Sequence, residues 1–276
     1  MIKINFIIAA YNEEDRIEGV INSIKKFADQ IVILDPGSSD RTVEFATKSY
    51  PIQVCLVEKD MFNIESRISS ALKIIKSHST SEWIFMMNCG EKFTDELGVK
   101  LLSVINSELD LYGVSIYRQS YTFGIKTHNQ KLFYIFRSFF KTNNNYRLLK
   151  YSAWDIEKSR MHAEFPIASD YLSSTIWLRP FDNLSLKHYR FGSLSDFEKK
   201  HSLYSTNEAN DLYMKGRKTN VLRMCIKPLL VFIYFSPSIF VSRKAFIVGM
   251  YHVFYKFQVE AKLYMMSKKI TNRVVD

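Results

Sequence analysis

The sequence predicts an α/β protein in which a mostly parallel β-sheet is flanked by helices and followed by a helical extension. Apolar runs of strand length alternate with segments of helical periodicity along residues 1–90. These runs are apolar throughout, as in strands that are buried on both faces. The chain has 276 residues, 47% of them hydrophobic, which suits one large domain with an elaborated tail.

Four strands and three helices are expected in alternation. The strands are the runs INFIIAA, QIVILD, PIQVCLVEK and SEWIFMMN, at residues 4–10, 30–35, 51–59 and 81–88. The helices lie between them, at residues 11–28, 40–50 and 64–79. Asn12 is expected to cap the first helix, and Ser39 or Asp40 the second. This order of elements implies a parallel sheet with helices on both of its faces.

Polar residues gather where the expected strands end. They are Tyr11, Asn12 and Glu13 after the first strand, Asp35, Gly37, Ser38 and Asp40 after the second, and Asn88, Gly90 and Glu91 after the fourth. Taken alone, DPGSSD is more typical of a turn with a helix cap, and YNEED of a capping box. Ligands of open parallel sheets bind outside the carboxyl ends of the strands, so three polar ends together predict a pocket.

The charge and the cysteines narrow the choice of partner and compartment. A formal net charge of +10 predicts an acidic partner, which is nucleic acid, anionic lipid or a phosphorylated substrate. No nucleic-acid-binding module is recognisable, and the basic residues lie beside long apolar runs, so we expect no nucleic acid partner. Cys55, Cys89 and Cys225 match no zinc pattern and no disulfide framework, and they fit a reducing cytoplasm.

Three stretches together resemble the family 2 glycosyltransferases, which have the GT-A fold. They are FIIAAYNEEDRIEGVINSI, IVILDPGSSDRTVEFA and SEWIFMMNCGEKFTDEL. Later stretches, among them YRLLKYSAWDIEKSRMHAE, resemble the branch that builds lipopolysaccharide core and related bacterial surface glycans. The resemblance implies a hexosyltransferase-type enzyme that moves a sugar, with inversion, from a nucleotide-sugar donor to a lipid-linked glycan such as lipopolysaccharide core or capsule.

The resemblance also implies roles for particular residues. Those placed at the nucleotide sugar are Ala10, Tyr11, Glu13, Asp35, Arg67 and Asn88. Branch members read VHE near the place where this chain reads MHAE, which implies Glu164 as the general base with His162 beside it. Asp155 and Asp170 are the alternative bases.

The acidic DxD motif that holds the metal in family members is altered here. Asn88 and Gly90 stand where the resemblance places two aspartates, and Glu91 follows. One interpretation keeps a weak Mg²⁺ or Mn²⁺ site formed by Asn88 and Glu91, although hard cations prefer more carboxylate charge. A second is metal-independent transfer, in which basic side chains neutralise the leaving group: Arg67, Lys92, Arg137 or Arg147. A third is a catalytically degenerate protein that acts as a glycan-binding or assembly scaffold.

The tail from about residue 215 mixes aromatic and apolar runs with Lys and Arg. This pattern is typical of helices that lie in a membrane interface with their cations at anionic headgroups. Helices packed on the core, or in a dimer contact, are the alternative. We expect a nucleotide-sugar-binding half at 1–110, an acceptor-binding half at 111–214 and membrane-associating helices at 215–276. The expected location is cytoplasmic and peripheral, at the anionic inner face of the bacterial inner membrane.

Overall fold

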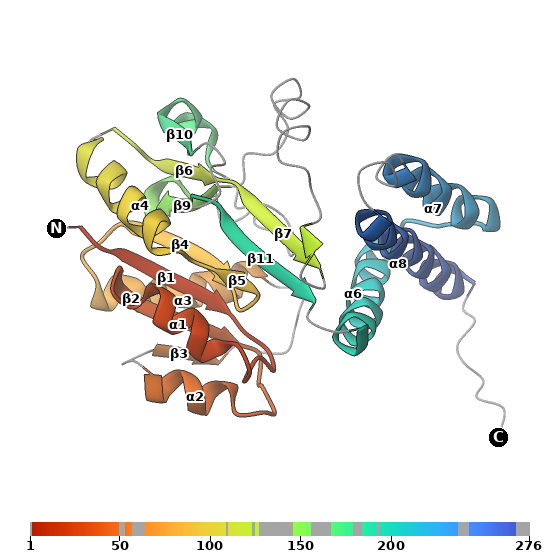
Figure 1. Cartoon of the computed structure of the whole chain (residues 1–276), viewed down its shortest axis with the longest axis horizontal. Helices are drawn as coiled ribbons and strands as arrows, with labels where there is room; N and C mark the ends of the chain where they lie inside the picture. Colours follow the sequence, from red (N-terminus) through yellow and green to blue (C-terminus); the bar gives the residue numbers. More distant parts are fainter. Residues whose placement is uncertain are drawn as a thin grey trace. The chain divides into compact units, whose positions relative to one another are not determined.

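The chain forms two compact units (Figure 1). A computed structural model describes residues 2–49, 53–56, 64–108, 110–122, 125–126, 146–155, 167–178, 184–191, 194–236 and 243–268. The N-terminal unit comprises Met1–Gln119 and Gln130–His188, and the C-terminal unit comprises Ser120–Asn129 and Tyr189–Asp276. These bounds differ from those of the three functional segments expected from the sequence, and that assignment of roles stays a prediction.

A sheet of seven strands forms the centre of the N-terminal unit, in the order β10-β6-β9-β4-β1-β2-β3. The strands are β1 (Ile4–Ala9), β2 (Ala28–Asp35), β3 (Gln53–Leu56), β4 (Trp83–Asn88), β6 (Gly113–Ile116), β9 (Tyr146–Lys150) and β10 (Thr175–Leu178). All pairs are parallel except those of β9, which runs antiparallel between β6 and β4. The four strands expected within residues 1–90 are confirmed, and β9, β6 and β10 extend the sheet beyond β4.

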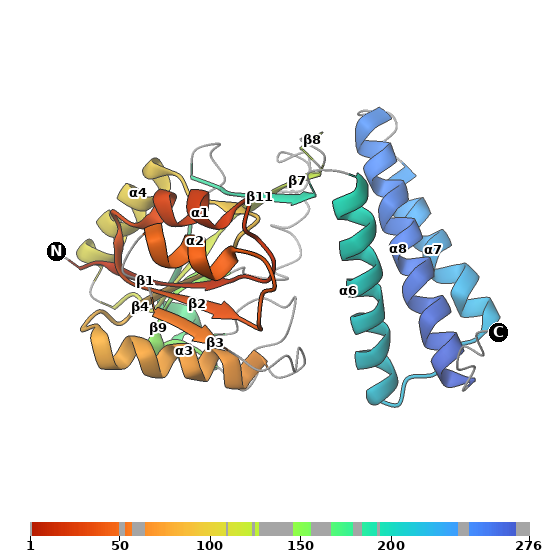
Figure 2. The same cartoon turned by 90° about the horizontal axis from the view of Figure 1, so that it is seen from below.

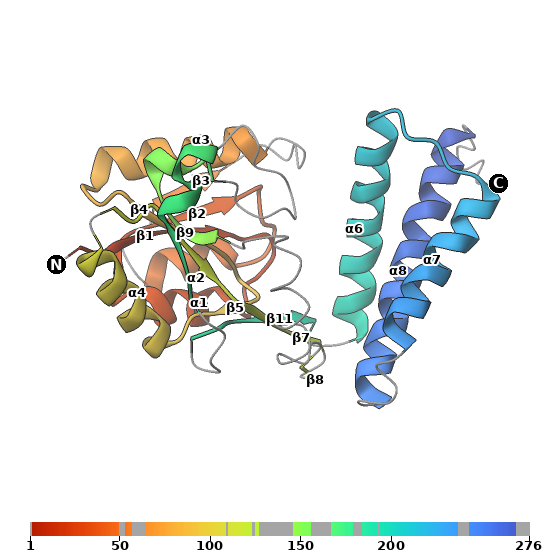
Figure 3. The same ribbon diagram turned by 90° about the horizontal axis from the view of Figure 1, so that it is seen from above.

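Helices cover both faces of this sheet, as Figures 2 and 3 show from opposite sides. On one face lie α1 (Ile17–Ile24), α2 (Thr42–Ser49) and α4 (Asp95–Ser107), and on the other lies α3 (Ile64–His78). Each face has its own apolar core, and β1 contributes to both because successive side chains of a strand point to opposite faces. Phe6 packs beneath α1 and α4, whereas Ile7 packs beneath α3.

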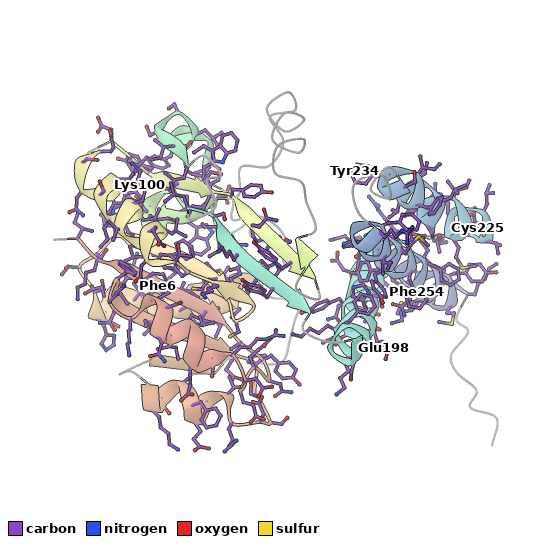
Figure 4. All side chains as sticks on the ribbon, viewed as in Figure 1. Phe6, Lys100, Glu198, Cys225, Tyr234 and Phe254 are labelled. Carbon is purple, nitrogen blue, oxygen red and sulfur yellow. The ribbon has the colours of Figure 1, made fainter. Side chains whose placement is uncertain are left out.

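An aromatic cluster fills the core on the α1 and α4 face. The ring centroid of Phe6, labelled in Figure 4, lies 5.5 Å from that of Phe85 and 5.5 Å from that of Phe93. All three side chains are fully or almost fully buried. Burying one such ring contributes about 2 kcal/mol, so the cluster holds β1 and β4 firmly together below the carboxyl edge of the sheet.

The first helix begins later than the sequence predicts. α1 starts at Ile17, Arg16 stands in the cap position, and no side chain caps the helix. The expected cap by Asn12 is therefore wrong. Asn12 instead adopts a positive φ of 53°, which asparagine tolerates, and takes part in a loop contact described below. The expected role of Asp40 at α2 is confirmed, because its carboxylate accepts the N–H of Thr42 at 3.0 Å.

Further short elements follow the end of β4. A short strand β5 (Glu91–Lys92) pairs antiparallel with β11 (Leu186–Phe191), which sets Glu91 opposite His188. Two 3₁₀ turns, η1 (Tyr151–Ala153) and η3 (Ser169–Ser174), stand at the end of β9 and before β10. The strand β7 (Arg118–Thr122) begins directly after β6. Both β7 and β11 continue from the N-terminal into the C-terminal unit.

Three helices form most of the C-terminal unit: α6 (Leu194–Met214), α7 (Val221–Phe235) and α8 (Arg243–Ser267). α8 packs against both of the others (Figures 1 and 2). Glu208 on α6 accepts hydrogen bonds from Tyr255 and Lys256, and the buried Glu260 accepts from Thr219 and Lys227. The strand β8 (Ile125–Lys126) pairs with β7. Within the described residues, no helix is long and apolar enough to cross a membrane.

Candidate active site

The register of the sheet brings the polar strand ends to one edge. Ala9, the last residue of β1, is paired with Leu34 of β2 on one side and with Asn88 of β4 on the other. The residues that follow these three positions therefore emerge side by side at the carboxyl edge. The structure brings together the predicted residues Ala10, Tyr11, Glu13, Asp35 and Asn88, as the strand-end argument expects.

Asp35 has one carboxylate oxygen that accepts protein hydrogen bonds and one that has no partner among the described residues. The residue is fully buried at the end of β2. Its Oδ1 accepts the N–H groups of Gly37 at 2.7 Å and of Ser38 at 2.6 Å. Gly37 has a φ of 92°, a backbone conformation that residues with a Cβ rarely adopt. Among the described residues nothing donates to Oδ2, which is buried. A buried polar atom of this kind costs free energy unless a ligand or water reaches it.

Hydrogen bonds join the loop after β1 to the loop after β2. The N–H of Asn12 donates to Ser38 Oγ at 2.9 Å, and Asn12 Oδ1 accepts the N–H of Ser39 at 2.9 Å. Further along, the N–H of Glu13 donates to Thr42 Oγ1 at 2.8 Å. The positive φ of Asn12 allows this pairing, because it turns the backbone toward the neighbouring loop.

Asp40 strengthens the same contact. Its carboxylate accepts the N–H of Glu14 at 3.1 Å as well as the N–H and hydroxyl of Thr42. Burial alone would raise the pKa of Asp40, but the hydrogen bonds from Thr42 and Glu14 outweigh it and lower that pKa. A carboxylate that stays ionised keeps both loops in place at neutral pH.

The other predicted nucleotide contacts differ in how far they are accessible. The Tyr11 side chain is exposed, and that of Ala10 is buried. Glu13 pairs with Arg16 at 3.3 Å. Arg67 lies on α3, but its side chain is outside the described part of the chain, as are the residues His162 and Glu164.

The turn after β4 holds Glu91 inside the protein. Its side chain is fully buried, and Oε2 accepts the N–H of Asn88 at 3.0 Å. Its Oε1 lies 3.0 Å from Nη2 of Arg147 and 3.7 Å from Nη1 of Arg118. The side-chain amide of Asn88 is half-buried and makes no protein hydrogen bond within the described residues.

The sequence analysis does not identify Arg118, although Arg118 fits the rule used for Asp35 and Asn88, a polar residue at the carboxyl end of a strand. Arg118 lies just beyond the carboxyl end of β6, but the sequence predicts no strand beyond residue 90. Arg147 is one of the basic residues expected to neutralise the leaving group; it donates to Glu91 at 3.0 Å, and that expected role stays a prediction. It is 5% exposed and also donates to the carbonyl of Met86 at 3.3 Å.

The donor set at this turn does not fit a divalent cation. Both oxygens of Glu91 already face protein donors, and Gly90 has no side chain. Within the described residues, no three His, Cys, Asp or Glu side chains are grouped so that they could hold a metal ion. Asn88 remains as one neutral ligand, which a hard cation binds weakly. Glu91 is therefore unsuited to bind a metal ion in this arrangement.

Comparison with known proteins supports the family resemblance. The glycosyl transferase family 2 profile matches residues 5–161, more than half of the chain. A glycosyltransferase of Rickettsia bellii is 23% identical over 96% of this chain and 87% of its own length. A glycosyltransferase of Rickettsia prowazekii is 25% identical over 99% of this chain and 90% of its own length. The SunS glycosyltransferase of Bacillus subtilis is 28% identical over 46% of this chain and 30% of its own.

The solved structures that this chain resembles are more distant in sequence. Glucosyl-3-phosphoglycerate synthase from Mycobacterium tuberculosis, crystallised with Mg²⁺ and uridine diphosphate, is 19% identical with a TM-score of 0.36, covering 55% of this chain and 57% of its own. A mycobacterial protein has a TM-score of 0.45 at 14% identity, covering 79% and 76%. The family match extends over β1 to β4 and the polar edge they form. The chain therefore belongs to glycosyl transferase family 2 and is a glycosyltransferase.

Proposed function

We propose that the enzyme transfers a sugar, with inversion, from a nucleotide-sugar donor to a lipid-linked surface glycan such as lipopolysaccharide core or capsule. The observation that carries the donor side is Asp35, whose buried Oδ2 has no protein partner among the described residues. A nucleobase N–H or a ribose hydroxyl would supply the missing donor. The exposed Tyr11 and the half-buried amide of Asn88 offer further contacts along the same edge.

The proposed reaction is a single displacement. The acceptor hydroxyl attacks the anomeric carbon, the bond from that carbon to the diphosphate breaks, and the electron pair leaves with the nucleoside diphosphate. Glu164 takes the hydroxyl proton as general base, with His162 beside it, a role supported by the sequence resemblance. We expect Glu164→Gln to lower kcat about a hundredfold or more while donor affinity stays unchanged, as judged by steady-state kinetics and calorimetry. Normal turnover in that variant would remove Glu164 as the base.

The acceptor side is supported by the surface of the C-terminal unit. α7 exposes an apolar stripe at helical spacing, made of Leu222, Ile226, Leu229, Leu230 and Ile233. α8 adds the exposed Phe254, and α7 the exposed Tyr234, both labelled in Figure 4. Three exposed cations, Arg217, Lys218 and Arg223, stand at the start of α7.

The charge of the chain is segregated in the same unit. Residues 120–129 and 189–276 carry sixteen Lys and Arg against six Asp and Glu, so they hold the entire net charge of +10. A basic surface beside exposed apolar side chains complements anionic headgroups above an acyl layer. We propose that this unit binds peripherally to the cytoplasmic face of the inner membrane, where a lipid-linked acceptor is presented.

The donor assignment is tested with the full-length protein and a panel of nucleotide sugars. We expect one donor to release its nucleoside diphosphate and to label a glycolipid acceptor. Asp35→Ala should weaken nucleotide affinity about tenfold to a hundredfold, because a hydrogen bond to a charged group contributes about 1.5–3 kcal/mol. Asp29→Ala, at the opposite end of β2, is the matched control and should bind as the wild type does.

Two results would overturn this proposal. Unchanged nucleotide affinity in Asp35→Ala would remove the observation that carries it. Nucleotide binding without transfer from any donor to any acceptor would favour the scaffold interpretation instead.

A further inference from the structure

Topology brings two arginines to the edge where the proposed donor would end in its diphosphate. β9 lies between β6 and β4 and runs opposite to both. Arg118 follows the carboxyl end of β6, Glu91 follows that of β4, and Arg147 stands near the start of β9. All three therefore meet at the same edge as Asp35, on the side of β4 away from β2.

We propose that Arg118, held by Glu91, stabilises the departing nucleoside diphosphate in a reaction that needs no divalent cation. This inference rests on the proposed function and names the group that does the work of the altered metal motif. In family members with the acidic motif, carboxylates hold a cation that neutralises the diphosphate. Here the one carboxylate of the turn holds cationic side chains instead.

The contacts of Glu91 suit a residue that holds arginine side chains in place, and they exclude a role as a metal ligand. The carboxylate is fully buried, and the N–H of Asn88 and the guanidinium of Arg147 account for both of its oxygens. A buried carboxylate is stable only when it is paired and hydrogen-bonded, as this one is. Turning it toward a metal ion would break its ion pair with the nearly buried Arg147.

The two arginines differ in what they can still bind. Arg147 is 5% exposed and donates to Glu91 through Nη2 and to the carbonyl of Met86 through Nη1, which makes it part of the framework. The Arg118 side chain is 36% exposed. Among the described residues its one ion pair is with Glu91, at 3.7 Å. A guanidinium has five N–H donors in a fixed fork that matches phosphate oxygens. Most donors of Arg118 therefore remain available to a ligand.

The charge balance of the cluster favours an anion. The carboxylate of Glu91 faces two guanidinium groups, and the partly exposed Arg118 presents positive charge to a ligand at this edge. As the bond from the anomeric carbon breaks, its electron pair moves onto the leaving phosphate oxygen. Arg118 donates hydrogen bonds to that diphosphate and transfers no proton to it. Donors fixed in advance where charge develops lower the barrier most.

The experiment compares nucleoside diphosphates with nucleosides in the presence of EDTA. Calorimetry on the full-length protein measures the affinity of UDP, GDP, CDP and ADP and of each parent nucleoside. We expect the preferred diphosphate to bind more tightly than its nucleoside without metal. Arg118→Ala should weaken the diphosphate about tenfold or more and leave nucleoside affinity unchanged, which also reports that the variant is folded. Arg118→Lys should recover part of the loss.

A matched control separates a local effect from a general loss of charge. Lys100→Ala removes one positive charge from an exposed position on α4, labelled in Figure 4, and should leave both affinities unchanged. With donor and acceptor present, transfer should persist in EDTA, and Arg118→Ala should lower kcat by more than it raises KM.

The outcomes distinguish this inference from the proposed function. Transfer and diphosphate binding that vanish in EDTA and return with Mg²⁺ or Mn²⁺ would overturn the inference and leave the proposed function standing. Unchanged diphosphate affinity in Arg118→Ala would also overturn it. Absence of nucleotide binding under every condition would overturn both.

Discussion

At the scale of single residues, the site depends on two buried carboxylates with opposite surroundings. In the part of the chain that the structure describes, one oxygen of Asp35 has no donor, whereas both oxygens of Glu91 have one. Burial disfavours a carboxylate unless every oxygen finds a donor. A ligand is therefore needed to complete the hydrogen bonds of Asp35, whereas the protein itself completes those of Glu91.

The role of Glu91 as an anchor leads to a prediction about stability. Glu91→Gln keeps the shape of the side chain but removes the charge that faces Arg147 and Arg118. Breaking a buried ion pair by removing one partner costs about 3–5 kcal/mol, so the free energy of unfolding should fall by about 3 kcal/mol. Urea denaturation measures the change, with Glu96→Gln, an exposed position on α4, as the control. A loss no larger than that of the control would show that the pair does not stabilise the fold.

At the scale of elements, the alternating strands and helices of residues 1–90 could be predicted because each has a clear period. Ile17, Val20, Ile21 and Ile24 of α1 are buried as their spacing implies. The start of α1 could not be predicted, because Asn12 serves equally well as a helix cap or as a left-handed loop residue. The partner loop after β2 decides between them, through Ser38 and Ser39.

The later elements show the limits of periodicity. β9 is a short strand that runs against its neighbours, and its place between β6 and β4 follows from no local pattern. Without that placement, Arg118 and Arg147 are two basic residues distant in sequence. In the folded protein both arginines face the carboxylate of Glu91, so the altered motif after β4 is paired with two basic side chains.

At the scale of the whole molecule, charge and apolar exposure coincide in one unit. The N-terminal unit carries twenty-two basic and twenty-two acidic residues and so has no net charge. The excess positive charge therefore lies in the C-terminal unit and is not spread over the whole chain. It adjoins the exposed stripe of α7 and favours a surface that is both anionic and apolar.

This segregation predicts how the full-length protein binds lipid vesicles. We expect cosedimentation with phosphatidylcholine vesicles that contain phosphatidylglycerol, weaker binding as salt rises, and little binding to phosphatidylcholine alone. Replacing both Leu222 and Leu229 by Gln should lower the binding at least tenfold, because each exposed leucine would otherwise bury apolar area. The control is Val99→Gln, an exposed apolar position on α4.

Two outcomes would contradict the membrane proposal. The first is equally weak binding to neutral and anionic vesicles. The second is a stable dimer in solution that the Leu222 and Leu229 substitutions dissociate, which would assign the stripe to a second copy of the chain.

The sequence by itself determined the alternation of elements, the polar strand ends and the basic tail, because periodicity, residue type and charge are local properties. Only the tertiary structure decided which oxygen of Asp35 lacks a partner, that Glu91 turns inward, and that Arg118 faces it. These depend on strand order and register, which join residues far apart in the chain. The physical reason is that hydrogen bonds and ion pairs are set by distance in space, and a sequence records only distance along the backbone.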